Sequence, residues 1–378
     1  MIAVPNMRLP MLAALLLGGA AGLLQPSVLH RPCVPNLAPP RRAAAARLAA
    51  TAPALEALAP SASPELCTAL GAMFEACAEV AGAVRTASCD STSCYTNLPR
   101  GPDEDAEIAV DLLAEDLIAT RLRACGAISL LSSAEDRTMH ALHGAGSAPA
   151  ARAGREPLAV CVDALGGASI DSLATVAVGT LFSVWKAESF SGAPSDLRVS
   201  GREALAAGAC SYGARTSLYL AIAGESCVRE WVLHDGTWTE ANVFETLVEG
   251  RLCSPANVQA YATNERYAAL VRYWLEKRYR LLLTGALVAD VLKILITGFG
   301  VYTSAAASTG ARPVPLLLYE AIPLALLIEA CDGTSSDGAA SSLLDVLLTT
   351  LDQRSQVAVG SPAEVARFVK MVGPAEPA

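Results

Sequence analysis

The sequence is poor in aromatic residues, in charge and in histidine. Aromatic side chains make up 5% and charged ones 17% of the 378 residues, whereas 53% are hydrophobic. The hydrophobic share is mostly Ala, Leu and Val, enough for a large core, which argues against an intrinsically disordered chain. With four His and no Cys-x-x-Cys pair among 11 Cys, the sequence does not support zinc sites of the usual spacing.

Acidic residues are missing from the first 55 positions, which hold five Arg and no Lys. Because the whole chain has a net charge of −9, the residues after position 55 carry −14. A body this acidic is repelled by phosphate backbones, so we expect no nucleic-acid partner. It can still hold an anionic substrate if metal ions lie between the two.

The chain also lacks an apolar run of the ~20 residues that a bilayer span needs. Met11–Leu24 is apolar, follows Arg8 and fits the core of a signal peptide. The acid-free stretch rich in Ala, Pro and Arg behind it resembles a transit peptide. We therefore expect residues 1–60 to be a two-part address for the complex plastid of an alga, and the mature form to have no membrane segment. A secretory signal followed by a linker is the alternative.

The rest of the chain interleaves helical and strand patterns, which predicts an α/β layered body. Residues 64–85 and 106–124 have helical spacing, and the second is expected to turn one apolar face inward, made of Ile108, Leu112, Leu113, Leu117 and Ile118. Further predictions are a strand at Leu158–Val162 that ends at Asp163, a helix at Gly201–Gly208 and a strand at Leu316–Tyr319. We expect two lobes, residues 61–245 and 246–372.

Twelve segments then follow one another in an order that resembles one enzyme family. They are VRTASC (Val84–Cys89), Cys94, EIAVDLLAEDL (Glu107–Leu117), SSAED (Ser132–Asp136), DALGGAS (Asp163–Ser169), VGTLFSVW (Val178–Trp185), YGART (Tyr212–Thr216), CSPAN (Cys253–Asn257), TGALVADV (Thr284–Val291), LLYEAIPLALLIE (Leu317–Glu329), SSDG (Ser335–Gly338) and LDQRSQVAVGS (Leu351–Ser361). Together they resemble the class 1 fructose-bisphosphatase family. VRTASC and the Cys-x4-Cys pair resemble its plastid sedoheptulose-1,7-bisphosphatase branch.

The resemblance implies a five-layer α-β-α-β-α sugar-phosphatase fold in two lobes. It also implies hydrolysis of a sugar 1-phosphate by a water that bound Mg²⁺ activates. Mg²⁺ prefers carboxylate and carbonyl oxygens, so such a site is a cluster of Asp and Glu. The implied partner is a sugar bisphosphate of the carbon-fixation (Calvin) cycle in the plastid, and the implied assembly is a homo-oligomer.

Residue by residue, four carboxylates match the family. Asp111 and Glu135 match catalytic acids, and Asp163 and Glu320 match metal ligands. Each has a plainer interpretation, because an Asp after a strand is often a turn or helix cap, and Asp111 and Glu135 can be solvated. On the substrate side Asn257 matches a contact residue. Arg215 of YGART matches too, and we interpret it as structural.

Other family positions are changed. The first acid of the family's Ser-Glu-Glu motif is Ala134, and the second aspartate of its strand-end motif is Gly166, with Ala168 at a serine position. The family's Arg-Tyr pair falls on Leu282 and Leu283, and its basic residues just before the Tyr-Glu pair fall on Val314 and Leu316. In the family these positions carry the cationic contacts to the sugar phosphates, and here they are apolar. Apolar side chains cannot make charge-assisted hydrogen bonds to phosphate. The changes favour the alternative of a weakened or inactive paralogue with a structural or regulatory role.

Cys89 and Cys94 enclose four small polar residues, Asp-Ser-Thr-Ser. Such a loop can close into a disulfide without restraint from a helix. In the plastid members that the chain resembles, this pair is a switch that thioredoxin reduces. Two free thiols in a loop are the alternative.

Overall fold

The computed structural model describes residues 52–53, 55, 62–86, 95–97, 107–143, 156–166, 177–191, 197–307, 314–339 and 341–374. The chain divides into two units, Met1–Arg47 and Leu48–Ala378, and every described residue belongs to the second. Most of the expected targeting segment and both Cys89 and Cys94 lie outside the described residues.

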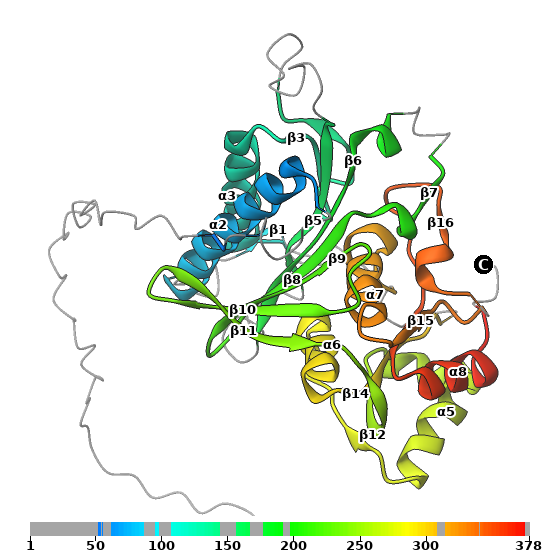
Figure 1. The fold of residues 1–378 in the computed structure, drawn as a ribbon. Coiled ribbons are helices and arrows are strands. Elements are labelled where there is room, and N and C mark those ends of the chain that lie inside the picture. The colour runs from blue at the N-terminus through cyan, green and yellow to red at the C-terminus, as the bar shows by residue number, and fades with distance from the viewer. Residues whose placement is uncertain are drawn as a thin grey trace, which may run out of the picture. The chain divides into compact units, whose positions relative to one another are not determined.

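The larger sheet has eight strands, all from the part of the chain before residue 245. Its order is β11-β10-β9-β8-β6-β5-β3-β4 (Figure 1). In chain order the strands are β3 (Ile128–Ser133), β4 (His140–Ala141), β5 (Leu158–Gly166), β6 (Val178–Lys186), β8 (Ala206–Tyr212), β9 (Thr216–Ile222), β10 (Val228–His234) and β11 (Thr237–Phe244). β3 and β5 are parallel, and the other neighbours are antiparallel.

The second sheet has five strands in the order β13-β12-β14-β17-β15. They are β12 (Val248–Pro255), β13 (Arg280–Leu281), β14 (Phe299–Ser304), β15 (Thr334–Ser336) and β17 (Val357–Gly360). β12 runs parallel to both of its neighbours. Two short ribbons pair β1 (Tyr95–Asn97) with β2 (Glu107–Ile108), and β7 (Val199–Ser200) with β16 (Leu347–Leu348).

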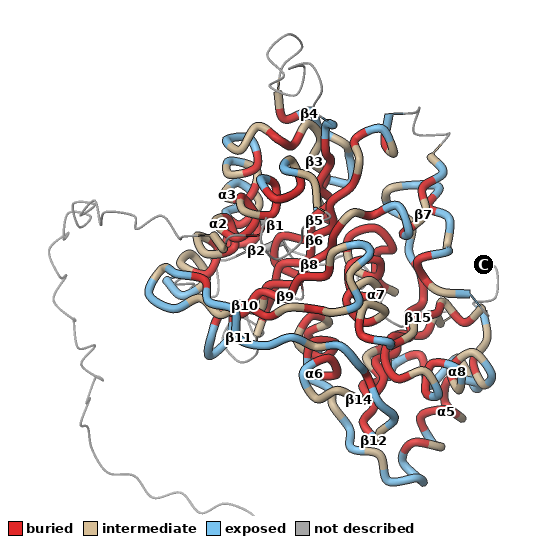
Figure 2. Tube along the Cα trace, viewed as in Figure 1, coloured by how far each residue is buried: buried red, intermediate tan, exposed pale blue. Residues whose placement is uncertain are grey.

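Helices fill the three layers around and between the two sheets. α2 (Pro64–Thr86) and α3 (Ala109–Cys125) cover the outer face of the large sheet, and α5 (Glu265–Glu276) and α8 (Pro362–Met371) cover that of the small sheet. α6 (Leu287–Thr297) and α7 (Ile322–Glu329) lie between the sheets, in the core where the buried segments of Figure 2 converge. The five-layer α-β-α-β-α fold predicted from the sequence is thereby confirmed.

Local signals define the helix ends near the second sheet. The Asn264 side chain accepts the backbone N–H of Tyr267 at 2.9 Å and caps the start of α5. α6 ends at Gly298, whose φ of +79° favours glycine. Pro362 occupies the first turn of α8, where its missing N–H costs nothing.

Helix α3 turns only part of the predicted face inward. Leu112 and Leu113 are 41% and 46% exposed. The buried positions are Val110, Ala114, Ile118 and Leu122. Of the predicted residues, Ile118 is thus confirmed as buried, and Leu117 packs partly buried against the same core. These residues are spaced four apart, so they form one stripe, and the small Ala114 lets α2 approach closely. The sequence pattern placed Leu112 and Leu113 on the buried face because they are large and apolar, and this assignment was wrong.

One other element differs from its prediction, whereas the helix predicted for residues 64–85 is confirmed as α2. The helix expected at Gly201–Gly208 is a single 3₁₀ turn, Gly201–Glu203, because β8 begins at Ala206. α2 is long and apolar enough, by length and composition, to cross a membrane. In this structure its apolar residues pack against α3 and the large sheet, including Leu70, Met73 and Phe74, which are fully buried.

Candidate functional site

The candidate site begins at Asp163, which lies inside β5 rather than at its end. The sequence LAVCVDALG of this strand is buried throughout, so the prediction that it ends at Val162 was wrong. Asp163 pairs with Leu181 and Gly166 pairs with Gly179, so β5 has one extra residue in a bulge between them. The carbonyl of Ala164 in the bulge accepts the Thr180 hydroxyl at 2.7 Å. The backbone here is thus held by β6.

The Asp163 carboxylate turns back onto its own strand. It accepts the backbone N–H of Leu165, and the whole residue is 8% exposed. An ideal Cβ at Gly166 would lie 2.3 Å from Asp163 Oδ2, so the carboxylate fills the space that a side chain at 166 would need. Burial raises the pKa of Asp163 well above its usual value, and the negative charges of neighbouring acids raise it further.

Glu320 comes from a π-helix, Leu317–Ala321, where the sequence pattern predicted a strand. That prediction was wrong because Leu316 makes only an isolated bridge, to Arg354, before the chain coils into α7. π-Helical turns are rare and often occur at functional sites. The Glu320 carboxylate accepts the backbone N–H of Leu316 at 2.6 Å. Like Asp163, it bonds to the backbone of its own segment.

The other three matched carboxylates all act electrostatically on Asp163. Glu320, Glu135 and Asp111, in that order of size, each add to the rise in the Asp163 pKa after burial. Asp111 lies in the first turn of α3 and is 8% exposed, and Glu135 is exposed just beyond the end of β3. The fold therefore brings together acids that are up to 209 positions apart in the chain, between Asp111 and Glu320.

At the positions where the family has phosphate-binding residues, this chain has side chains that cannot bind phosphate. Leu316 is 4% exposed and belongs to the core between the sheets, and Leu282 packs against that core. Leu283 is 46% exposed. Asn257 is buried, and its amide donates to the Ala305 carbonyl at 3.0 Å.

Two arginines that the sequence analysis did not select border this region. Arg354 donates to the Val314 carbonyl at 2.8 Å, and the Nε of Arg137 donates to the Ala134 carbonyl at 2.9 Å. Arg137 also acts electrostatically on Tyr319, the neighbour of Glu320. Arg137 directly follows SSAED and Arg354 lies within the Leu351–Ser361 segment, but these places alone do not distinguish the two from ordinary surface arginines.

Arg215 has a partner inside the large sheet. It donates to the Glu230 carboxylate, which is 1% exposed. The same carboxylate accepts the Tyr219 hydroxyl at 2.9 Å and the Asn242 amide at 2.5 Å. A buried carboxylate needs such donors to offset its loss of hydration. This supports a structural interpretation of Arg215.

The side chains that the structure describes do not fit a Mg²⁺ site. Among the described residues, no three His, Cys, Asp or Glu are grouped so that they could hold a metal ion. Ala134 and Gly166 supply no side-chain donor, and Ala134 is packed in the core between the sheets. Asp163 and Glu320 are directed at backbone N–H groups. Mg²⁺ demands near-octahedral oxygen donors and gives up water reluctantly, so this arrangement is a poor cage.

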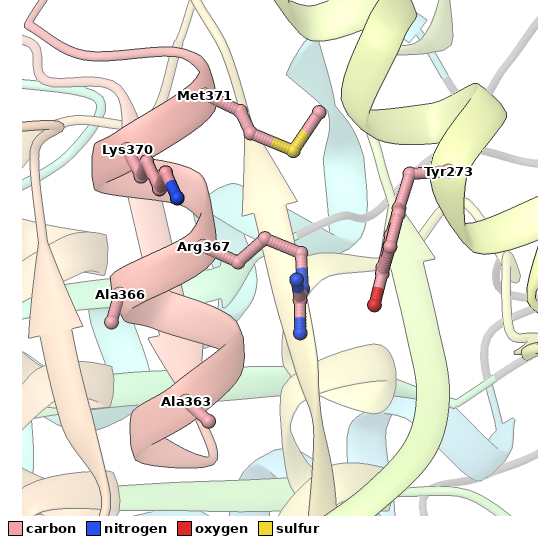
Figure 3. Close-up of a pocket in the computed structure, with 6 residues that line it drawn as sticks. All are labelled: Tyr273, Ala363, Ala366, Arg367, Lys370 and Met371. Atoms are coloured by element: carbon pink, nitrogen blue, oxygen red, sulfur yellow. The ribbon is translucent and has the colours of Figure 1, made fainter.

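A separate pocket of about 360 Å³ lies between α5 and α8 (Figure 3). Its lining residues are Tyr273, Ala363, Ala366, Arg367, Lys370 and Met371. The Arg367 guanidinium lies 4.2 Å from the centre of the Tyr273 ring, and Arg367 also pairs with the buried Glu364 at 3.3 Å. None of the residues predicted for the site lines this pocket. Its arginine, Arg367, is already engaged by the Tyr273 ring and the Glu364 carboxylate.

Comparison with known proteins gives a consistent result. The family model for the fructose-1-6-bisphosphatase N-terminal domain matches residues 55–242, and that for the C-terminal domain matches residues 247–373. The chain is 34% identical over 307 residues to the chloroplastic sedoheptulose-1,7-bisphosphatase of Chlamydomonas reinhardtii, covering 81% of this chain and 73% of the relative. It is 30% identical to fructose-1,6-bisphosphatase 1 of Bos taurus over 284 residues, covering 69% of this chain and 76% of the relative.

Solved structures show the same fold. A crystal structure of a candidate sedoheptulose-1,7 bisphosphatase from Toxoplasma gondii superposes with a TM-score of 0.73 at 28% identity, covering 85% of this chain and 98% of that one. The fructose-1,6-bisphosphatase of Leishmania major superposes with a TM-score of 0.71 at 20% identity, covering 85% and 99%. From its matched domains, its sequence identities and its five-layer fold, the chain belongs to the class 1 fructose-1,6-bisphosphatase family of sugar bisphosphatases.

Proposed function

We propose that this protein is a plastid sedoheptulose-1,7-bisphosphatase-like protein whose hydrolysis of the sugar 1-phosphate is greatly weakened. One observation carries the proposal. Asp163 still lies within the electrostatic reach of Glu320, Glu135 and Asp111, yet the adjoining position 166 offers only a glycine, against which Asp163 has folded. The acidic residues of a family site are kept, but their carboxylates are not arranged to bind a metal ion.

The expected loss of rate is large. The family's reaction depends on several oxygen donors that act together to stabilise charge in the transition state. Losing ~4 kcal/mol of that stabilisation slows a reaction about a thousandfold. We therefore expect turnover at least about a thousandfold below that of a relative with a complete site. Asp111, Glu135, Asp163 and Glu320 are proposed as the remaining acid cluster, with Asn257 on the substrate side.

A phosphate-release assay tests this proposal. The reduced protein is given Mg²⁺ with sedoheptulose-1,7-bisphosphate or fructose-1,6-bisphosphate, beside an intact relative under the same conditions. Slow release that requires Mg²⁺ would support a weakened enzyme. Turnover at the level of the relative would refute the proposal.

A second candidate is a non-catalytic subunit that binds an active relative. The burial of Leu316 favours this candidate. The family has a basic residue at this position, but here the side chain is part of the core and cannot contact a phosphate unless the core opens. Mixing the purified chain with an active relative and measuring both assembly size and turnover separates the two candidates. A hetero-oligomer with altered turnover favours the subunit, and separate assemblies favour the weakened enzyme acting alone as a homo-oligomer.

The plastid location rests on the sequence of residues 1–60 and on the chloroplastic relatives. A fluorescent fusion of residues 1–60 should enter a complex plastid, and deleting Met11–Leu24 should prevent entry. Unchanged import of the deletion would contradict the two-part address. A plastid location would also bring the Cys89–Cys94 pair into contact with thioredoxin.

A further inference from the structure

The Asp163 carboxyl group lies so close to Gly166 that it occupies the space of a side chain at that position. A Cβ at position 166 would meet three atoms of the Asp163 carboxyl group: Oδ2 at 2.3 Å, Cγ at 3.0 Å and Oδ1 at 3.3 Å. Gly166 does not have a positive φ, so alanine suits its backbone conformation. The glycine is therefore needed for the space that it leaves and not for its backbone conformation.

The backbone around the pair has little freedom to adjust. β5 is hydrogen-bonded to β3 on one side and to β6 on the other, and all nine of its residues are buried. Thr180 holds the bulge through Ala164, and its hydroxyl also contacts the Tyr212 hydroxyl at 2.7 Å. A side chain added at 166 must therefore displace the Asp163 carboxylate, which is the free end of a side chain.

We infer that Gly166 is a positioning residue that seats the Asp163 carboxylate on the Leu165 N–H and so withdraws it from any bound cation. The replacement of an acid by Gly166 thus has two effects. It removes one oxygen ligand for a metal ion. It also lets the carboxylate of Asp163, three residues earlier, turn toward the backbone. This inference rests on the proposed function and explains why the remaining acids do not form a metal cage.

Glu320 provides an internal comparison. Its carboxylate is also bonded to the backbone, at Leu316, but through a turn that involves no glycine. A substitution at position 166 should therefore release Asp163 and leave Glu320 in place. The predicted effect is specific to one of the two carboxylates.

The first test is hydrogen exchange of the Leu165 amide in the full chain. Gly166→Ala should speed exchange at Leu165 at least about tenfold, because the amide loses its acceptor. Asp163→Ala, which removes the acceptor directly, sets the scale. Gly82→Ala is the matched control, since a Cβ at Gly82 on α2 would meet nothing within 4 Å. Unchanged Leu165 exchange in Gly166→Ala, with faster exchange in Asp163→Ala, would overturn the inference.

The second test is titration of the same variants with Mn²⁺ alone, followed by its electron paramagnetic resonance. Gly166→Ala adds no donor, so a several-fold gain in Mn²⁺ affinity over the unmodified chain and over Gly82→Ala would show that Asp163 has been released. Gly166→Asp should bind more tightly still. If only Gly166→Asp gains affinity, donor number alone matters and the positioning role is wrong. Tight binding by the unmodified chain would instead count against the proposed function.

Discussion

The hydroxyl groups of Ser132 and Tyr319 lie 2.7 Å apart and are both buried, although 187 positions separate them in the chain. Ser132 is near the end of β3, three residues before Glu135. Tyr319 lies in the π-helix directly before Glu320. This hydrogen bond joins the large sheet to the π-helix that carries Glu320.

Replacing Tyr319 with Phe should therefore weaken the junction. The change leaves the Ser132 hydroxyl buried without this partner, so the free energy of unfolding should fall by about 1–3 kcal/mol in urea denaturation. Tyr267→Phe is the control, because its hydroxyl contacts Thr303 in the outer core, away from the site. A double cycle with Ser132→Ala should give a coupling of about 1 kcal/mol. No coupling would mean that the contact contributes nothing.

Asp163→Asn should stabilise the protein at neutral pH. Burial and three acidic neighbours raise the pKa of Asp163 in the folded state above its unfolded value of about 3.9. The stability that this group contributes is then full below the unfolded pKa and is lost as the pH rises through the folded one. Asparagine avoids that loss, so we expect a gain of at least ~1 kcal/mol at pH 8 and almost none near pH 4, measured by denaturant unfolding.

Asp345→Asn is the control of opposite sign. The hydrogen bond from Arg202 lowers the pKa of Asp345, so its stability contribution is present above the unfolded pKa. This pair is about half exposed, and its loss should cost no more than ~1 kcal/mol at pH 8. If Asp163→Asn also destabilises at pH 8, the four acids do not repel one another as described.

Arg215→Met should lower stability without affecting sugar-phosphate binding. Its guanidinium contacts the buried Glu230, whose remaining donors are Tyr219 and Asn242. We expect a cost of about 1–3 kcal/mol in thermal or urea unfolding. Arg229→Met removes an ion pair to Glu240 at the edge of the same sheet and should cost less than ~1 kcal/mol. Loss of ligand binding at unchanged stability would make Arg215 a phosphate contact instead.

The double reversion Ala134→Glu with Gly166→Asp should strengthen Mg²⁺ binding. Because Ala134 is 8% exposed and packed in the core, the metal-free variant should lose about 1–3 kcal/mol of stability. Added Mg²⁺ should then raise its melting temperature by mass action. Turnover should recover only in part, since Leu282, Leu283, Val314 and Leu316 remain. Recovery of full family turnover would show that these positions are not needed for binding.

The Cys89–Cys94 pair gives a covalent prediction. Mass spectrometry of the oxidised protein should find the two residues in one cross-linked peptide, which thioredoxin should separate. Cys161, which is fully buried and whose thiol has a pKa raised by burial, is the internal control and should stay reduced. Free thiols at 89 and 94 under oxidising conditions would leave two ordinary cysteines.

The sequence by itself determined the family and the layered fold, and it predicted which acids form the site. Twelve segments in order predicted the five-layer fold, and they also selected Asp163, Glu320, Glu135 and Asp111, all of which the fold brings into electrostatic contact. Losses at positions 134 and 166 were equally visible, because the replacement of an acid by Ala or Gly removes a donor whatever the fold.

Only the tertiary structure decided how the remaining groups are directed. Apolar spacing could not show that Ala114 and not Leu112 faces α2, because the fit between two helices depends on side-chain volume as well as hydrophobicity. A bulge and a π-turn likewise have no strong sequence signal, so Asp163 and Glu320 were placed on the wrong local structures. Their bonds to Leu165 and Leu316 are local in the chain, but they depend on the bulge that β5 forms against β6 and on the π-turn, which no local pattern encodes.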